Sequence, residues 1–484
     1  MPGLGSKLIL AAVLLASLLV RLYRIDTPIA GWRQADTAAI ARNFHQNGYM
    51  FFYPQIDWGG DTPGYVETEC PLYPFAVSIL YALLGDSAVW GRLLTALFAL
   101  VSIYTTYLLV RQWVDESTGL WSAIFFAVLP RNTYYGRAFM PEAALLMCAL
   151  LGIYFFSTWL RGEKPRHFYL SALFVAFAGL IKLPILYIGL PLLFLAWLKY
   201  QRRLLRIPAL WLFALLVLLP VAAWYYHAHQ TFQRFGLTFG IWQYGSDKWG
   251  NWDLVLTGAY WYKVLIRNIA ENHLAWIGFP LFLWGLFLKR RTTQEMVLDV
   301  WLLAGLVYLI IVGQGNYVHE YYQLPLMIPV AAFMGKVYAR YMKRGLIEDK
   351  RSLALALSFL ALTAVSLARY VSGLEREAQE VASERELVRQ VREETDEKAL
   401  FVFLFDGDPT LQYHCQRKGW QLGAVEVTRR DLLDRIERGA RYVLGSYRAM
   451  EGDSGRQELE SRLPVPFQLR FDDGTHFLLR LQVE

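Results

Sequence analysis

The chain has 484 residues, of which 55% are hydrophobic and only 18% carry a charge. Apolar runs of membrane-helix length recur along its first three quarters, which argues against a soluble protein. The net charge of +7 comes from Lys and Arg clusters between apolar runs, a pattern typical of cytoplasmic loops rather than of nucleic-acid binding. The three cysteines have neither metal-site spacing nor the pattern of a disulfide framework.

The first apolar segment, residues 8–25, lacks a small-residue cleavage pattern, so we expect an uncleaved membrane span rather than a signal peptide. Further apolar segments follow near 71–84, 88–110, 119–135, 142–160, 168–181, 184–198, 207–226, 273–288, 296–313, 321–339 and 352–370. Segment 71–84 is shorter than the roughly 20 residues that a span needs.

Basic loops predict the topology. They lie at 161–167, 199–206, 289–291 and 339–351. These loops share one side only if 71–84 does not cross, so we predict about 11 spans, a juxtamembrane or re-entrant helix at 71–84 and a cytoplasmic N-terminus. The segments that then face outward are 26–87, 136–141, 227–272, 314–320 and the tail after 370.

The tail has the pattern of a separate domain. Residues 373–398 are rich in Glu and Arg with a narrow apolar stripe, which predicts a charged helical linker. Over 399–484, strands alternate with helices and end in a hairpin around Asp-Asp-Gly at 472–474. The predicted fold is therefore a polytopic α-helical membrane protein with a small C-terminal α/β domain outside the membrane.

Ionisable and aromatic side chains gather in the predicted outward segments. They are Arg33, Asp36, Glu67, Glu69, Arg131, Arg137, Glu142, Lys182, His319, Glu320, Tyr321 and Tyr322. Singly, each has a structural explanation, such as a helix cap for Asp36, a first-turn acid for Glu142 or a snorkelling Lys182. Together, ionisable groups at helix ends beside lipid indicate a pathway or a site.

Such a ring of charges favours one kind of chemistry. Arg33, Arg137 and Lys182 can hold a phosphate at the membrane surface. A carboxylate nearby can take a proton from an acceptor as it attacks a sugar carbon, while the cations stabilise the departing phosphate. A substrate with a lipid tail and a phosphate head fits this placement.

The order of short motifs resembles the GT-C superfamily of membrane glycosyltransferases, in particular bacterial relatives of protein O-mannosyltransferases and of lipid A aminoarabinose transferases. The motifs are RQAD (33–36), ETECPLYPF (67–75), MPEAALL (140–146), IKLP (181–184) and YYQLPLMIP (321–329). The similarity covers residues 1–340 and implies a GT-C transmembrane domain over 1–372, with outward loops at 26–87 and 227–272.

The resemblance implies an inverting glycosyltransferase of the bacterial cytoplasmic membrane that takes its sugar from a polyprenyl-phosphate donor. Asp36 stands in the place of the general base, and Glu142 in that of a second acid that orients the acceptor or assists Asp36. The residues expected to bind the donor's phosphate or lipid are Arg33, Arg137, Lys182, Tyr321 and His319.

This chain departs from the family pattern at Cys70, where relatives have a lysine after the acid Glu69. Arg33, Arg137 or Lys182 would then have to compensate for that lysine. Some relatives bind a metal near the first-loop acid, so Glu69 is a candidate for a metal ligand or for orienting the acceptor. No histidine spacing defines a metal site, and a divalent metal is left open.

Three alternatives stay open on the sequence alone. The acceptor can be a glycan, a lipid or a protein. The aromatic loop 227–272, with Trp242 and Tyr244, fits either sugar stacking or an interfacial belt. The chain as a whole also fits a transporter or flippase for lipid-linked glycans or a non-catalytic assembly protein, although it lacks the repeated halves of many transporters.

Overall fold

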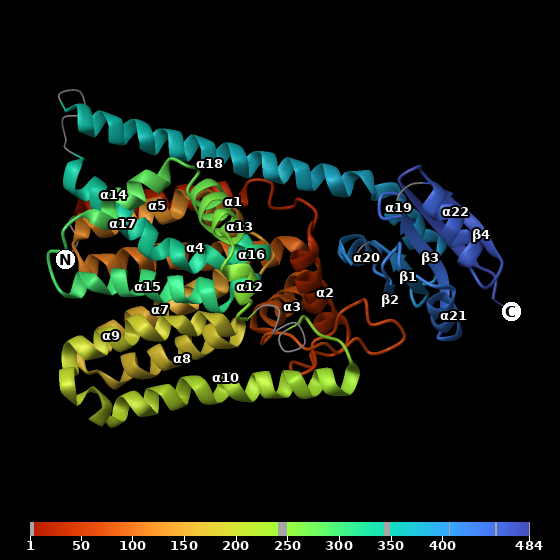
Figure 1. Cartoon of the computed structure of the whole chain (residues 1–484), viewed down its shortest axis with the longest axis horizontal. Helices are drawn as coiled ribbons and strands as arrows, with labels where there is room; N and C mark the ends of the chain where they lie inside the picture. Colours follow the sequence, from red (N-terminus) through yellow and green to blue (C-terminus); the bar gives the residue numbers. More distant parts are fainter. Residues whose placement is uncertain (1–3, 241–248, 343–348, 406, 451–452, 484) are drawn as a thin grey trace. The chain divides into compact units, whose positions relative to one another are not determined.

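The computed structural model describes residues 4–240, 249–342, 349–405, 407–450 and 453–483 (Figure 1). The chain divides into two compact units. The first, here called the helical unit, comprises Met1–Ile25, Gly91–His227 and Gly240–Gly373. The second, here called the mixed unit, comprises Asp26–Trp90, Ala228–Phe239 and Leu374–Glu484.

The helical unit is built almost entirely from helices, three of which (α4, α10 and α18) share residues with the mixed unit. The α-helices are α1 (Leu4–Leu22), α4 (Ala88–Trp113), α5 (Glu116–Val128), α6 (Pro130–Tyr135), α7 (Glu142–Gly162), α8 (Pro165–Ile181), α9 (Gly189–Tyr200), α10 (Pro208–Phe235), α12 (Trp252–Val255), α13 (Gly258–Trp261), α14 (Gly278–Phe287), α15 (Val297–Ile311), α16 (Gly313–Val318), α17 (Met327–Tyr341) and α18 (Lys350–Ser383). Short 3₁₀ segments lie at Leu183–Ile188, Gln201–Arg206, Gln294–Met296 and Glu320–Leu326, and a π-helix at Tyr262–His273.

Seven helical segments of the described chain are long and apolar enough to cross a membrane. They are Leu4–Leu22, Ala88–Trp113, Glu142–Gly162, Leu183–Arg206, Pro208–Phe235, Gln294–Ile311 and Lys350–Ser383. Three shorter apolar helices accompany them, among them Leu72–Leu84, the segment predicted not to cross. The chain is thus a multi-pass membrane protein, as predicted, whereas the total of about 11 spans and their sidedness stay predictions.

Small residues allow close packing between helices of this unit. A Cβ atom added to Gly152 of α7 would lie 2.6 Å from a methyl group of Val175 in α8. Gly335 of α17 lies equally close to α5, where an added Cβ would be 2.8 Å from the backbone nitrogen of Ser122. Close approach of this kind is how membrane helices gain van der Waals contact where lipid offers no hydrophobic driving force.

Three buried arginines gather around the C-terminal end of α1. Arg21 donates to the carbonyl oxygens of Ser17 and Asn132, each at 3.1 Å. Arg137 donates to the carbonyl of Arg24 at 2.9 Å, and Arg92 to that of Ile25 at 3.0 Å. The carbonyls of Arg24 and Ile25 follow the end of α1, where backbone acceptors lack intrahelical partners and carry negative partial charge, so the guanidinium groups of Arg137 and Arg92 satisfy them.

The mixed unit combines helices with a five-stranded sheet. Its helices are α2 (Trp32–Gln46), α3 (Leu72–Leu84), α19 (Arg385–Glu394), α20 (Thr410–Cys415), α21 (Arg429–Glu437) and α22 (Asp453–Arg462). Its strands are β1 (Leu400–Leu404), β2 (Gly419–Gln421), β3 (Ala440–Ser446), β4 (Phe467–Asp472) and β5 (His476–Leu481).

The sheet has the order β2-β1-β3-β5-β4 and is mixed; strands β1, β2, β3 and β4 are labelled in Figure 1. β1 runs parallel to both β2 and β3, whereas β5 is antiparallel to β3 and β4. The predicted hairpin is confirmed as β4–β5, with Gly474 at a positive φ in the turn. The three-residue strand β2 had no clear sequence signal, because it is too short to show alternation.

The predicted linker 373–398 is helical but not continuous. It contains the end of α18 and then α19, whose Leu387 and Val391 pack against Phe401 and Phe403 of β1. These side chains share one helix face, which is the apolar stripe visible in the sequence.

We expect Arg21→Met to lower the melting temperature of the purified protein in detergent. The substitution keeps an apolar stem but removes the hydrogen bonds by which the guanidinium joins α1 to the carbonyl of Asn132, and each hydrogen bond from a charged group contributes about 1.5–3 kcal/mol. Thermal unfolding followed by intrinsic fluorescence measures the change. Arg202→Ala, at an exposed position, is the control, and equal melting temperatures for Arg21→Met and wild type would contradict a stabilising role of Arg21.

Candidate active site

Asp36 lies inside helix α2 rather than at its end. It is the fifth residue of the helix, which begins after Gly31, so the helix-cap explanation is wrong. The side chain is only 2% exposed, and its Oδ1 atom accepts a hydrogen bond from the indole Nε1 of Trp58 at 3.0 Å. A buried, held carboxylate is a better candidate for chemistry than a solvated one.

The surroundings of Asp36 place the pKa of its carboxyl near neutral pH. Burial raises the pKa of Asp36 to about 7, while the hydrogen bond from Trp58 and the positive charge of Arg33 pull the same pKa down. A general base works best when its pKa lies near the working pH, since both protonation states are then accessible.

Arg33 and Glu69 form an ion pair in the same unit, with 2.8 Å between Nη2 and Oε2. The Arg33 guanidinium also lies 5.4 Å from the ring centroid of Phe239, and Thr68 donates to the same Glu69 oxygen at 3.1 Å. Both members of the pair are partly exposed, so an anion or a cation could still reach them. Their predicted roles, phosphate binding for Arg33 and metal or acceptor contact for Glu69, stay predictions.

In the helical unit, Glu142 and Lys182 form a buried ion pair of 2.9 Å between Oε1 and Nζ. Glu142 opens α7 directly after Pro141, and Lys182 follows the last residue of α8. The second carboxylate oxygen of Glu142, Oε2, is buried and has no hydrogen-bond partner among the residues that the structure describes. An unsatisfied buried acceptor is costly, so a substrate hydroxyl that donates to it would be bound favourably.

Aromatic side chains complete this cluster. The Lys182 ammonium lies 4.6 Å from the ring centroid of Tyr321 and 4.0 Å from that of Tyr322. His319 stacks on Tyr321 with 5.1 Å between centroids. The helical unit therefore brings together four of the predicted site residues, namely Glu142, Lys182, His319 and Tyr321.

Glu320 links the neighbouring elements of this cluster. It pairs with Arg131 at 2.9 Å and accepts hydrogen bonds from Tyr135 at 3.2 Å and Asn272 at 2.8 Å. Arg137, in contrast, is buried and donates to the backbone carbonyl of Arg24 at 2.9 Å. Phosphate binding by Arg137 stays a prediction that no contact in the structure requires.

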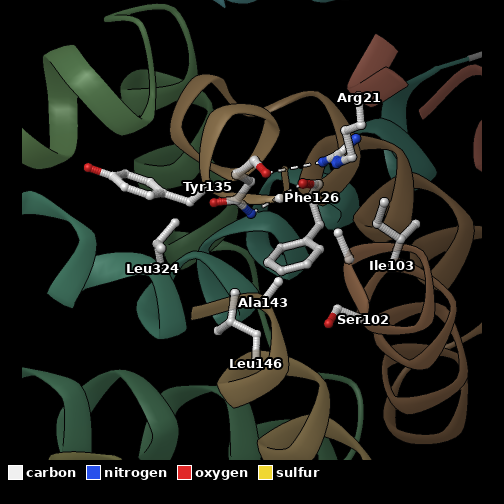
Figure 2. Close-up of a pocket in the computed structure, with 11 residues that line it drawn as sticks. Arg21, Ser102, Ile103, Phe126, Tyr135, Ala143, Leu146 and Leu324 are labelled. Atoms are coloured by element: carbon white, nitrogen blue, oxygen red, sulfur yellow. Dashed lines mark hydrogen bonds between the residues drawn. The ribbon is translucent and has the colours of Figure 1, made fainter. Parts of the chain in front are cut away.

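Figure 2 shows a small cavity in the helical unit between Arg21, Ser102, Ala143 and Leu146. Its volume is about 20 Å³, enough for one water molecule, which needs roughly 10–15 Å³ by this measure. The Tyr135 ring points away from Arg21 in this view. The cavity is therefore too small for a sugar and is a packing void beside Arg21.

Within the described part of the chain, no three His, Cys, Asp or Glu side chains lie together in a way that could hold a metal ion. We therefore derive no step through a metal. Of the predicted aromatic loop, Trp242 and Tyr244 fall outside the described residues, whereas Trp252 and Tyr262 are exposed. Their exposure fits sugar stacking and an interfacial belt equally.

Comparison with known proteins identifies the fold. Residues 68–227 match a family described as dolichyl-phosphate-mannose-protein mannosyltransferase. The chain as a whole has the GT-C glycosyltransferase fold, which confirms the resemblance found in the sequence. No curated protein sequence matches the chain.

Individual solved structures share this fold at low sequence identity. ArnT from Cupriavidus metallidurans bound to undecaprenyl phosphate superposes with a TM-score of 0.69 and 14% identity, over 99% of this chain and 98% of ArnT. The archaeal oligosaccharyltransferase AglB from Archaeoglobus fulgidus, in complex with an inhibitory peptide and a dolichol-phosphate, has a TM-score of 0.61 and 12% identity, over 98% of this chain and 74% of AglB. The arabinofuranosyltransferase AftD from Mycobacteria has a TM-score of 0.55 and 14% identity, over 98% and 41%.

We expect Asp36→Asn to raise the melting temperature at pH 8 and to leave it unchanged near pH 4. In the unfolded chain the carboxyl titrates near 3.8, whereas burial raises its folded pKa to about 7. The folded protein therefore loses stability as pH rises from about 4 to 7, by up to about 4 kcal/mol. Asparagine cannot ionise and escapes this loss.

Thermal unfolding at a series of pH values measures this effect. Asp253→Asn, at an exposed position, is the control and should show no such pH-dependent difference. A gain for Asp36→Asn that is equal at pH 4 and pH 8 would contradict the raised pKa.

Proposed function

We propose that the protein is an inverting glycosyltransferase that moves a sugar from a polyprenyl-phosphate donor to an acceptor. The proposed place is the outer face of the bacterial cytoplasmic membrane, with the N-terminus in the cytoplasm and residues 399–484 outside. The GT-C fold supports transfer over transport, and lipid phosphates are bound in the structures of ArnT and AglB. The single observation that carries the proposal is the buried Asp36 carboxylate held by Trp58.

In the proposed reaction, Asp36 takes the proton from the acceptor's hydroxyl or amine. The freed electron pair attacks the anomeric carbon of the sugar as the bond from that carbon to the phosphate oxygen breaks. The phosphate leaves with the electrons of that bond, so a single displacement inverts the anomeric centre. A pKa of Asp36 near 7 lets the base be ionised before the reaction and protonated after it.

Lys182 is proposed to stabilise the phosphate as its charge develops, with Tyr321 and His319 lining the donor's path. Their mutual contacts support this grouping. Glu142 holds Lys182 through Oε1 and offers Oε2 to a substrate hydroxyl. Arg33, Arg137 and Glu69 are proposed as further contacts to the donor phosphate or the acceptor.

Asp36→Asn should lower sugar transfer by about 10²–10⁴-fold, the usual contribution of a general base. Transfer from a radiolabelled polyprenyl-phosphate sugar to membrane acceptors measures the loss. Because Asp36→Asn is expected to fold stably, a loss of activity without a loss of melting temperature would separate chemistry from folding. Asp253→Asn is the matched control, and full activity of Asp36→Asn would refute the assignment.

Lys182→Met should weaken binding of polyprenyl phosphate at least tenfold, because it removes the proposed phosphate contact. The same change also leaves Glu142 buried without its cation, which on its own is destabilising. The double variant Lys182→Met with Glu142→Gln removes that second effect. Binding measured on the lipid phosphate alone should stay weak in the double variant, and its recovery would show that Lys182 only neutralises Glu142.

A further inference from the structure

The C-terminal domain is joined to the segment that follows α2, and both belong to the mixed unit. The backbone nitrogen of Gly60 donates to the carbonyl of Gly419 at 2.8 Å, and the nitrogen of Gly419 donates to that of Asp57 at 3.1 Å. Gly59 forms an antiparallel bridge with Trp420 of β2. Since β2 is an edge strand of the sheet, residues 57–60 pair with that edge through this single bridge and the two backbone hydrogen bonds.

Side chains strengthen this junction. The amide of Gln412 in α20 donates to the carbonyl of Asp57 at 2.9 Å. Arg42 of α2 pairs with the Asp57 carboxylate and donates to the carbonyl of Tyr413 at 3.0 Å. The junction is largely buried, so its hydrogen bonds define one position for the backbone at Asp57.

Trp58 follows Asp57 directly and is the residue whose indole N–H donates to Asp36. The position of this donor therefore depends on a backbone that the C-terminal domain holds. The groups that act on the Asp36 carboxyl are Arg33 and Trp32 on its own helix and Asp57 and Trp58 on the held segment.

We propose, on the basis of the proposed function, that Trp58 is the positioning residue of the general base and that the C-terminal domain holds Trp58 in place. A hydrogen bond to the ionised carboxylate both orients it and favours the form that accepts a proton. This gives the domain a role in the reaction step itself, through the contacts of Gln412 and Gly419 with Asp57.

Trp58→Phe in the full-length protein is the direct test. Removing the donor should raise the pKa of Asp36, so the acidic limb of the kcat–pH profile should move to higher pH by about one unit. Activity should fall several-fold at pH 7 and recover at pH 9. A merely structural role of Trp58 would lower kcat at every pH and leave the limb in place, which would overturn the proposal.

Gln412→Ala tests the domain's part. Gln412→Ala should move the acidic limb of the kcat–pH profile to higher pH, by less than Trp58→Phe does, because the carbonyl of Asp57 loses one of its two donors. Gln468→Ala, an exposed glutamine on β4 at the opposite edge of the sheet, should leave the profile unchanged. Identical profiles for Gln412→Ala and Gln468→Ala would refute the holding role.

A second readout separates this proposal from the proposed function. Infrared difference titration follows the ionisation of the Asp36 carboxyl without any sugar transfer. The band of this carboxyl is identified by its loss in Asp36→Asn. The titration midpoint should rise in Trp58→Phe and in Gln412→Ala even if the donor lipid has been wrongly assigned. Unchanged midpoints in both variants would overturn the positioning role, whereas a full transfer activity of Asp36→Asn would overturn only the general base.

Discussion

The cost of burying a carboxylate is the constraint on which the arrangement around α2 depends. An isolated ionised acid away from water is expensive, so Asp36 can keep a usable charge only if donors and cations are held close to it. Trp58 and Arg33 provide these groups from two different segments. Their combined effect leaves the pKa near neutrality, which is the compromise that proton transfer requires.

Buried charges in the helical unit also need compensating groups close to them. Glu142 and Lys182 compensate one another, and within the described part of the chain the remaining oxygen of Glu142 has no hydrogen-bond partner. Three other buried cations donate instead to backbone carbonyls, namely Arg21, Arg92 and Arg137. The pair of Glu142 and Lys182 thus differs from these three arginines, because an acceptor that a substrate hydroxyl could use lies beside its cation.

Much of this could be predicted from the sequence. Apolar runs predicted the membrane helices, and Asp-Asp-Gly between alternating residues predicted the β4–β5 hairpin, because both signals are local. The motif order pointed to Asp36, Glu142 and Lys182, and the last two are indeed in contact. Trp58 was not predicted, because an indole 22 residues from Asp36 meets it only through tertiary folding. The same holds for Gln412, whose partner Asp57 is 355 residues away in the chain.

The pairing of residues 57–60 with β2 has a further consequence for the sheet. An uncovered edge strand is a template for pairing with another chain and for aggregation. Gly59 and Gly60 cover β2, and Gly60 must be glycine there, since it has a positive φ and an added Cβ would collide with the Trp420 indole. The other edge, β4, carries the charged Arg470, whose guanidinium is held by Glu394. Residues 57–60 thus both carry Trp58, the hydrogen-bond donor to Asp36, and shield the β2 edge of the sheet from pairing with another chain.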